Sequence, residues 1–278
     1  MTINSSTSST SQSETLSKIA KYFDKHGDTW RLAYGDDTEH WYDYPPLRNR
    51  ERFALALIDD EPKGSAVDLG CGNGHLVVKM KKLGFDRVRG VDLSDKMLAA
   101  ARSLARASGM ENGVELLKAN VEDVATIPSE SVDVCTALGV VEYLDSDAPL
   151  LKEVFRILRP GGAAVMQTRN YRCINSRAKH FIATFVPGIR PKIRYREHVR
   201  GAFLQEANRL GFTVEREFFS HFYALFPLNL LPVVRRVIRP LDNFLSKCCE
   251  RFATCGFSEF LASMYIVKLR KGDSPKGI

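Results

Sequence analysis

The chain has 278 residues, 44% of them hydrophobic, and carries a net charge of +7 at pH 7. This length and apolar content support a packed core and argue against a chain that is disordered throughout, and they fit one large domain or one domain with additions. The cysteines form no C-x-x-C pair and show no metal-ligand spacing. We therefore expect free thiols in a reducing cytoplasm.

The N-terminal part begins with a polar tail. Residues 1–15 are rich in Ser and Thr and almost free of apolar side chains, so we expect a disordered tail without the apolar stretch of a secretory signal. Residues 16–62 then carry Tyr22, Trp30 and Tyr34 ahead of the core. We expect this part of the chain to form a helical lid.

The run AVDLGCGNGHL, residues 66–76, is the most informative sequence feature. An apolar strand carries Asp68 near its end, and the chain then turns through Gly70, Gly72 and Gly74 before a helical pattern starts. Glycines let a ligand come close to the backbone, and a helix that starts there presents free N–H groups to the same point. In dinucleotide-binding turns, G-x-G-x-x-G, the third glycine comes one residue later. The run predicts a site for a small ligand with an anionic or carboxylate portion.

Strands and helices alternate after this turn. The strand over residues 87–91 ends at Asp92, where a carboxylate would meet ribose hydroxyls, and Ser94 is the expected N-cap of the next helix. Further strands are expected over residues 114–117, 132–138 and 163–168, with a helix over 148–158 that ends in the turn Arg159-Pro160-Gly161-Gly162. This alternation predicts a doubly wound α/β fold with a mostly parallel sheet.

The last hundred residues complete the sheet and add two insertions. A helix over residues 198–210 should precede strands over 212–219 and 260–269, which gives a seven-stranded, Rossmann-like sheet whose last strand is antiparallel, with helical insertions around strands 5 to 7. The first insertion, residues 171–195, belongs to a strongly basic stretch, which implies an anionic partner. The second insertion, residues 220–259, is apolar and then basic.

The second insertion cannot cross a membrane as one helix, because Pro227 and Pro232 interrupt its apolar stretch. Its pattern fits either an amphipathic helix that lies in a membrane interface with anionic headgroups or a cap over a substrate pocket, and both interpretations stay open. We expect no nucleic-acid partner, since both insertions are aliphatic rather than built of aromatic stacking platforms.

Five blocks in order resemble the class I S-adenosylmethionine (SAM)-dependent methyltransferases: VDLGCGNG, GVDLS, NVED, SVDVCTALGVVEYL and ILRPGGAAV. The resemblance is to methyltransferase domains of the 11/25 type, with looser similarity to membrane-associated quinone and tetrapyrrole O-methyltransferases. It implies a SAM-binding core over residues 63–170, continued over 196–219 and in a final strand over 260–270, followed by a tail over 271–278.

The resemblance also implies roles for single residues. Asp68 would orient the methionine ammonium group, Asp92 would accept the ribose hydroxyls, and Asn120 would accept from the adenine amino group. The cofactor-binding residues implied in this way are Asp68, Gly70, Cys71, Gly72, Asp92, Leu93, Asn120, Val121, Glu122 and Leu138. For Leu93 and Leu138, an ordinary role at a strand end explains the residue equally well. Because a helix before the core closes over the cofactor in similar enzymes, Tyr22, Trp30 and Tyr34 are expected to line the acceptor pocket.

An oxygen acceptor must also lose its proton, either to a base or before it binds. The candidate catalytic residues are Glu142, Tyr143, His198 and His221, each of which also has an ordinary structural explanation. The stretch GVVEYL resembles a segment that binds a divalent metal in some quinone O-methyltransferases. It keeps Glu142 but has Gly139 and Tyr143 at the other ligand positions, so no metal is expected.

We therefore expect a cytoplasmic, SAM-dependent methyltransferase that acts on an apolar or amphiphilic small molecule, such as a lipid, a quinone or a tetrapyrrole. O-methylation is the first expectation, C- or N-methylation stays open, and the protein either is soluble or acts peripherally at a membrane surface. The alternatives are a catalytically silent SAM-binding partner protein, a soluble natural-product methyltransferase and a nicotinamide oxidoreductase. The RPGG turn before the fifth strand argues against the last of these.

Overall fold

The computed structural model describes residues 15–26, 45–185, 195–222, 241, 252–254 and 256–272. Trp30, Tyr34, the polar tail up to residue 14 and most of the second insertion lie outside the described residues. Nothing in the structure therefore bears on the predictions for those segments.

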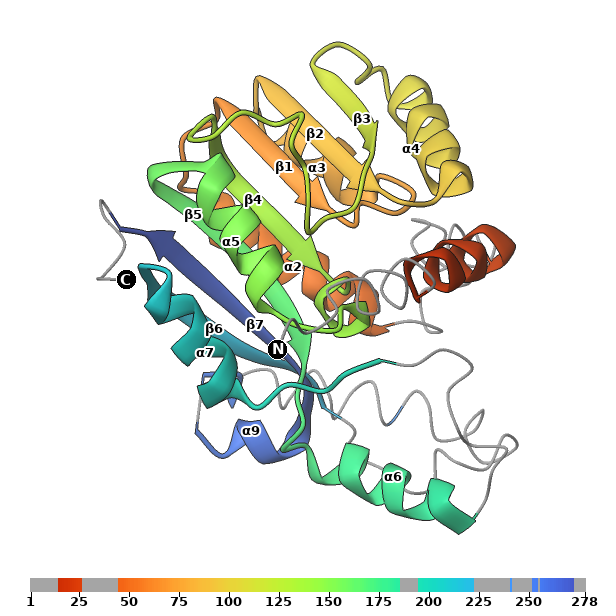
Figure 1. Ribbon diagram of the computed structural model, residues 1–278, viewed down its shortest axis with the longest axis vertical. Coiled ribbons are helices and arrows are strands. Elements are labelled where there is room, and N and C mark those ends of the chain that lie inside the picture. Colours follow the sequence, from red (N-terminus) through yellow and green to blue (C-terminus); the bar gives the residue numbers. More distant parts are fainter. Residues whose placement is uncertain are drawn as a thin grey trace, which may run out of the picture.

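Seven strands form one sheet in the order β3-β2-β1-β4-β5-β7-β6 (Figure 1). The strands are β1 (Ser65–Leu69), β2 (Arg87–Asp92), β3 (Val114–Lys118), β4 (Val132–Leu138), β5 (Leu158–Arg169), β6 (Phe212–Phe222) and β7 (Ala262–Lys271). Neighbours from β3 to β5 are parallel, while β7 runs antiparallel to both β5 and β6. The predicted seven-stranded, doubly wound sheet with its last strand antiparallel is confirmed.

Helices cover both faces of the sheet (Figure 1). The described helices of the core are α2 (Pro45–Ile58), α3 (His75–Lys82), α4 (Asp95–Ala107), α5 (Ala148–Ile157) and α7 (Arg200–Arg209). The first three pack with buried strand residues such as Ala66 and Val134, and the last two pack on the opposite face with residues such as Cys135 and Val267. Every residue of β1 and β4 is buried, as expected for central strands of a parallel sheet covered on both faces.

Two strands are longer than the sequence pattern indicates. β5 starts at Leu158 instead of residue 163, because Leu158 already pairs with Val132, and the RPGG segment forms an irregularity, with Gly161 at φ 74°, before pairing resumes at Ala163. β6 continues to Phe222 instead of ending at residue 219, since Phe222 still pairs with Ala262 of β7. Both extensions depend on the partner strand, which a pattern along one strand cannot show.

Two other boundaries move for a similar reason. α7 begins at Arg200 rather than at residue 198, because His198 forms a bridge with Asn170 and its N–H donates to the Arg169 carbonyl at 2.7 Å. β7 begins at Ala262 rather than at residue 260, because a short helix, α9 (Ser258–Leu261), comes directly before it. Among the described helices, none has the length and the apolar character that a membrane span requires.

The parallel strands place their carboxyl ends at one edge of the sheet, where ligands bind in open α/β folds. A helix formed by residues 15–26, red in Figure 1, lies at this edge. The short η1 (Val141–Tyr143) follows β4 at the same edge, and α6 (Ile174–Phe185) follows β5. This arrangement gathers residues from the ends of five strands, β1 to β5, beneath one helix.

Candidate functional site

The glycine turn after β1 has the open backbone that its sequence indicates. Gly70, Gly72 and Gly74 all have positive φ, at 76°, 51° and 80°. A Cβ atom at Gly70 would lie 2.7 Å from the Val140 Cβ, and one at Gly74 would lie 2.7 Å from the Ala101 Cβ, whereas nothing lies within 4 Å of one at Gly72. The turn is therefore packed on both sides and open at Gly72, where backbone faces a cavity.

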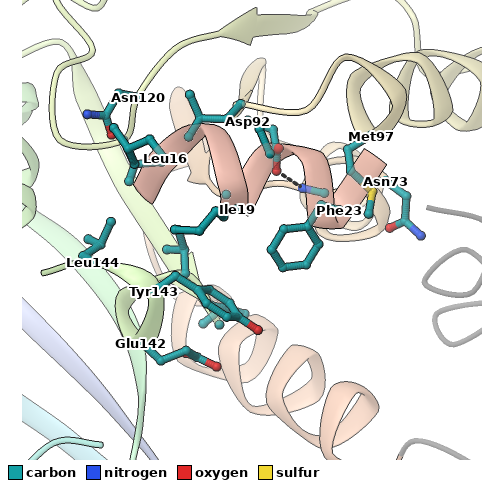
Figure 2. Close-up of a pocket in the computed structure, with 18 of the residues that line it drawn as sticks. Leu16, Ile19, Phe23, Asn73, Asp92, Met97, Asn120, Glu142, Tyr143 and Leu144 are labelled. Carbon is teal, nitrogen blue, oxygen red and sulfur yellow. Dashed lines mark hydrogen bonds between the residues drawn. The ribbon is translucent and has the colours of Figure 1, made fainter. Parts of the chain in front are cut away.

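Asp92 closes this turn at the end of β2. Its Oδ2 accepts a hydrogen bond from the Gly72 N–H at 2.9 Å, drawn as the dashed line in Figure 2, and its Oδ1 accepts from the Ser94 N–H at 2.9 Å. Burial raises the pKa of Asp92. Ser94 caps α4, because its Oγ accepts from the Met97 N–H at 3.1 Å, which confirms the predicted N-cap. Each Asp92 oxygen keeps a lone pair that can accept from a ligand hydroxyl.

A first cavity runs from this turn beneath the N-terminal helix (Figure 2). Asn120 and Asp92 lie on one side of that helix in the view, and Glu142 and Tyr143 lie on the other. Most of the lining is apolar, and it comes from Leu16, Ile19, Ala20, Phe23, Leu93, Met97, Val121, Leu138, Val140, Leu144 and Met264. An elongated ligand with one flat apolar part and a few polar groups suits such a lining.

A narrow cavity joins the first one and holds two opposite charges. Asp68 and Arg50 both line it, and Arg50 also lines the first cavity. The Thr136 hydroxyl donates to Asp68 Oδ1 at 2.7 Å, and burial raises the pKa of Asp68 to about 7. Burial also lowers the pKa of Arg50, whose Nη1 donates to Gln167 Oε1 at 3.5 Å. A buried acid and a half-buried arginine at one end of a cavity suit the ammonium and carboxylate groups of an amino acid.

The ten residues implied for cofactor binding divide by position. Those that line the first cavity are Gly70, Gly72, Asp92, Leu93, Asn120, Val121 and Leu138. Asp68 and Cys71 line the narrow cavity, and Glu122 lines neither of them. The Glu122 N–H instead donates at 3.1 Å to Asn120 Oδ1, the atom that was expected to accept from adenine. Asn120 therefore already uses one lone pair within its own loop.

The N-terminal helix is attached to the core at two points. Asp24 Oδ1 accepts from the Ser94 hydroxyl at 2.5 Å and from the Lys96 N–H at 3.4 Å. Phe23 meets Tyr143 edge to face, with 5.5 Å between the ring centroids. The helix thus bridges the start of α4 and η1 across the first cavity.

A second cavity, of about 660 Å³, opens on the other side of this helix. It shares Ile19, Glu142, Tyr143 and Leu144 with the first cavity. The rest of its lining is polar, aromatic or charged and comes from Thr15, Lys18, Lys21, Tyr22, Lys25, His26, Asp145, Tyr195 and Arg196. Of the three aromatic residues expected in an acceptor pocket, Tyr22 lies here. The two cavities meet at Glu142 and Tyr143.

Glu142 is buried at this junction, with 3% of its surface exposed. Its Oε1 lies 3.3 Å from the Nε of Arg169, while its Oε2 is buried and has no hydrogen-bond partner among the described residues. Such a buried carboxylate oxygen is costly unless a ligand completes its hydrogen bonds. Burial raises the pKa of the neighbouring Tyr143. Its phenol therefore stays protonated and can donate or accept a hydrogen bond but does not act as a base.

The two candidate histidines lie outside both cavities. His198 is buried, and its Nε2 lies 2.9 Å from Asp147 Oδ1. His221 has a left-handed backbone, with φ of 61°, and burial together with the charge of Arg169 lowers its pKa to about 3. The structure thus brings Glu142 and Tyr143 to the junction and places the two histidines elsewhere. Within the described part of the chain, no three His, Cys, Asp or Glu side chains are grouped as metal ligands.

Three residues of this site were missed by sequence reasoning. Arg50 lies on α2, Arg169 at the end of β5 and Tyr195 at the end of the first insertion, and Arg169 stacks over the Tyr195 ring at 4.2 Å. Arg50 and Tyr195 carry no local motif. The position of Arg169 at the carboxyl end of a parallel strand is the one signal that could have identified it.

The glycine turn, the acids of β1 and β2 and the strand order are similar to those of the class I SAM-dependent methyltransferases. Residues 67–166 match the family model described as a methyltransferase domain, and the predicted resemblance is confirmed.

Two curated relatives are similar to part of this chain. The chain is 32% identical over 139 residues to a ubiquinone biosynthesis O-methyltransferase of Nitrosomonas europaea. The aligned region covers 47% of this chain and 58% of that protein. It is 28% identical over 162 residues to the protein of the same name from Hahella chejuensis, covering 55% and 64%. The chain thus spans less than two thirds of the length of these curated relatives.

A solved structure of magnesium protoporphyrin IX methyltransferase from Synechocystis, with bound SAH, superposes with a TM-score of 0.65 at 14% identity, over 93% of this chain and 100% of that one. A SAM-dependent methyltransferase from Mesorhizobium loti superposes with a TM-score of 0.55 at 23% identity, over 80% of this chain and 98% of that one. At these identities the two structures show a shared fold.

Proposed function

We propose that the protein binds SAM in the first cavity and transfers its methyl group to a hydroxyl oxygen of a quinol-like small molecule held in the second cavity. The observation that carries this proposal is that the two cavities meet at Glu142 and Tyr143, so that a donor and an acceptor can come into contact there. The names of the curated relatives support a quinone-type acceptor.

The residues present fit the parts of SAM. Asp92 offers carboxylate oxygens to the ribose diol, and Asp68 and Arg50 offer opposite charges to the amino-acid end. Leu93 and Val121 offer apolar surface to adenine, with Asn120 at the rim of the cavity. Each group of the cofactor thus finds a residue of matching chemistry.

SAM, when bound, supplies a methyl group on a sulfonium that is already a good leaving group. The protein therefore contributes mainly alignment and exclusion of water. The helix formed by residues 15–26 covers the junction, which removes water from it. Glu142 Oε2 lies at the junction, buried and without a partner among the described residues, and in this proposal it takes the hydroxyl proton of the acceptor.

The proposal is tested with the purified protein, by titrating SAM and nicotinamide dinucleotide in a calorimeter and then measuring transfer from labelled SAM. The acceptor panel contains a catechol or hydroquinone, a tetrapyrrole carboxylate, an aromatic amine and a phospholipid. We expect SAM binding, no nicotinamide binding and a methyl ether as the main product. SAM binding without transfer would instead support a silent SAM-binding partner, and nicotinamide binding would support an oxidoreductase.

We further propose that the protein meets its acceptor at an anionic membrane surface. α6 exposes Phe181 and Phe185, which are 69% and 71% accessible, and its neighbour α9 exposes Phe260. Arg172 lies over the Phe260 ring at 5.9 Å, so basic and aromatic side chains share this end of the molecule. Aromatic residues beside cationic ones favour the interface of an anionic bilayer.

Flotation with vesicles of phosphatidylcholine and phosphatidylglycerol tests this surface. We expect the protein to float with the vesicles at low salt, and we expect the double variant Phe181→Ser/Phe185→Ser to stay in solution. Val214→Ser, an exposed apolar position on β6, serves as the matched control and should float like the unaltered protein. An unaltered protein that stays in solution at low salt contradicts the membrane proposal and leaves the methyltransferase proposal intact.

A further inference from the structure

We propose that Arg169 binds the reacting oxygen of the acceptor and stabilises the negative charge that develops on it during methyl transfer. The inference rests on the proposed function and adds a residue that determines which hydroxyl groups can be methylated. Its basis is the position of one guanidinium group among the side chains of the junction.

Arg169 reaches the junction from the carboxyl end of β5. It lines the first cavity, while the Tyr195 ring, on which its guanidinium stacks at 4.2 Å, lines the second. Its Nε lies 3.3 Å from Glu142 Oε1. The cation therefore contacts a wall residue of each cavity, and an oxygen that approaches Glu142 also approaches Arg169.

The guanidinium lies among aromatic rings and the Glu142 carboxylate, and Arg50, which lines the same cavity, is a second cation near them. Its charge acts on Tyr143 of η1, on Tyr195 and on His221 of β6, besides the ion pair with Glu142. Burial raises the pKa of both tyrosines, and the pKa of His221 is lowered to about 3, so these three groups are neutral near pH 7. Arg169 thus supplies positive charge directly beside the Glu142 carboxylate and three neutral rings.

The chemistry of the step requires such a charge. As the acceptor O–H proton moves to Glu142, negative charge grows on the oxygen beside a carboxylate, which disfavours it unless a cation lies close by. The oxygen lone pair forms the new O–CH₃ bond, the C–S bond breaks, and its electron pair stays on sulfur. The products are a methyl ether, a neutral thioether and a protonated Glu142, so atoms and charges balance.

Arg50 is the alternative cation, because its charge also reaches Glu142. It lines the narrow cavity together with Asp68, and its Nη1 donates to Gln167, which places it at the amino-acid end of the donor. The two arginines should therefore have separable effects: Arg50 on cofactor affinity and Arg169 on the acceptor.

The test compares Arg169→Met and Arg169→Lys with the unaltered protein on a series of phenols of graded acidity at neutral pH. For a weakly acidic phenol, Arg169→Met should lower kcat/KM about 100-fold, because one group that stabilises the developing oxyanion is lost. For a nitrophenol that is already ionised, the same variant should lower kcat/KM by less than about tenfold. Arg169→Lys keeps the charge and should recover part of the loss. SAH affinity should change by less than about threefold, whereas Arg50→Met should weaken it by at least about tenfold.

The matched control is Arg209→Met, an exposed arginine at the end of α7, which should behave like the unaltered protein. Full activity of Arg169→Met on weakly acidic phenols, or an equal loss on all phenols, would overturn the inference while leaving the proposed function in place. An unaltered protein that methylates none of the phenols would overturn both. If Arg169→Met does not fold, Arg169→Lys provides the test. A loss of kcat/KM in Arg169→Lys that is equal for every phenol would then overturn the inference.

Discussion

The donor side and the acceptor side of the junction are built in different ways. On the donor side, the glycine turn and Asp92 come from consecutive strand–helix units and are joined by a hydrogen bond from the Gly72 N–H to Asp92 Oδ2 at 2.9 Å. On the acceptor side, Glu142, Arg169 and Tyr195 come from three separate segments, and the N-terminal helix contributes a fourth. A site made from local turns is fixed by backbone geometry, while one assembled from distant segments depends on side chains that can change without changing the fold.

This difference indicates where specificity for the methyl donor and specificity for the acceptor lie. In the proposed function, the donor side binds SAM with the glycine turn and the carboxylates of Asp68 and Asp92. The acceptor side offers charged and aromatic side chains around a second cavity, so its lining can be altered while the sheet stays the same. The predictions below separate the two sides, because a residue of one side should affect one binding event and spare the other.

The largest expected effect is that of Glu142→Gln. Loss of the proton-accepting carboxylate should lower kcat by about 100- to 1,000-fold, while SAH affinity stays within about threefold. Rates of a single turnover with labelled SAM measure the first quantity and calorimetry measures the second. Glu206→Gln, on α7, is the control. A large loss of SAH affinity in Glu142→Gln would show that this residue belongs to the donor side.

Asp92→Ala should weaken SAM binding more than tenfold, because both the ribose contact and the support of the Gly72 and Ser94 N–H groups are lost. The acceptor KM should change little. Asp95→Ala, at a neighbouring and exposed acid that pairs with Lys118, controls for loss of charge in this region. Unchanged SAM affinity in Asp92→Ala would remove the ribose assignment.

The pH dependence of SAM binding should report on Asp68. With a pKa of about 7 in the unliganded protein, its carboxyl group is about nine-tenths protonated at pH 6, and a neutral acid attracts the SAM ammonium group less. SAM affinity should therefore fall about tenfold between pH 8 and pH 6. Thr136→Val removes a hydrogen bond that favours the ionised form and should move this profile to higher pH. A flat profile would contradict the assignment of Asp68.

The same raised pKa has a consequence for stability. Between the ordinary pKa of 3.8 and about pH 7, the folded protein binds a proton at Asp68 that the unfolded chain has released. The Asp68 contribution to stability is therefore present at low pH and is lost as the pH rises through this range. Asp68→Asn should remove that loss, which denaturant unfolding at pH 5 and pH 8 would measure. An unaltered pH dependence in the variant would contradict this account.

The smallest expected effect is that of Asp24→Ala on the helix that covers both cavities. The loss of its contact with Ser94, worth about 1 kcal/mol, should weaken SAH binding about fivefold, mainly through faster dissociation. Stopped-flow displacement of SAH measures the rate, with Ser17→Ala on the exposed face of the same helix as the control. Equal rates in the two variants would show that this contact does not hold the helix over the donor.

The sequence predicted the donor side well because its residues are close together along the chain. Gly72 and Asp92 lie at the ends of adjacent strands, so the strand pattern alone places them side by side. It predicted Glu142 as a candidate because it follows β4 in the same way. It could not separate Glu142 from His198, since only the folded chain shows that His198 faces Asp147, away from both cavities.

By itself, the sequence determined the class of fold, the order of strands along the chain and the glycine turn that lines the first cavity, because periodicity and glycine positions act over a few residues. The tertiary structure alone decided that Arg50 and Asp68 line one narrow cavity, that Arg169 contacts Glu142 and Tyr195, and that a helix over residues 15–26 lines two cavities. These contacts join segments far apart in the chain, and the packing of the whole sheet, rather than any local pattern, brings them together.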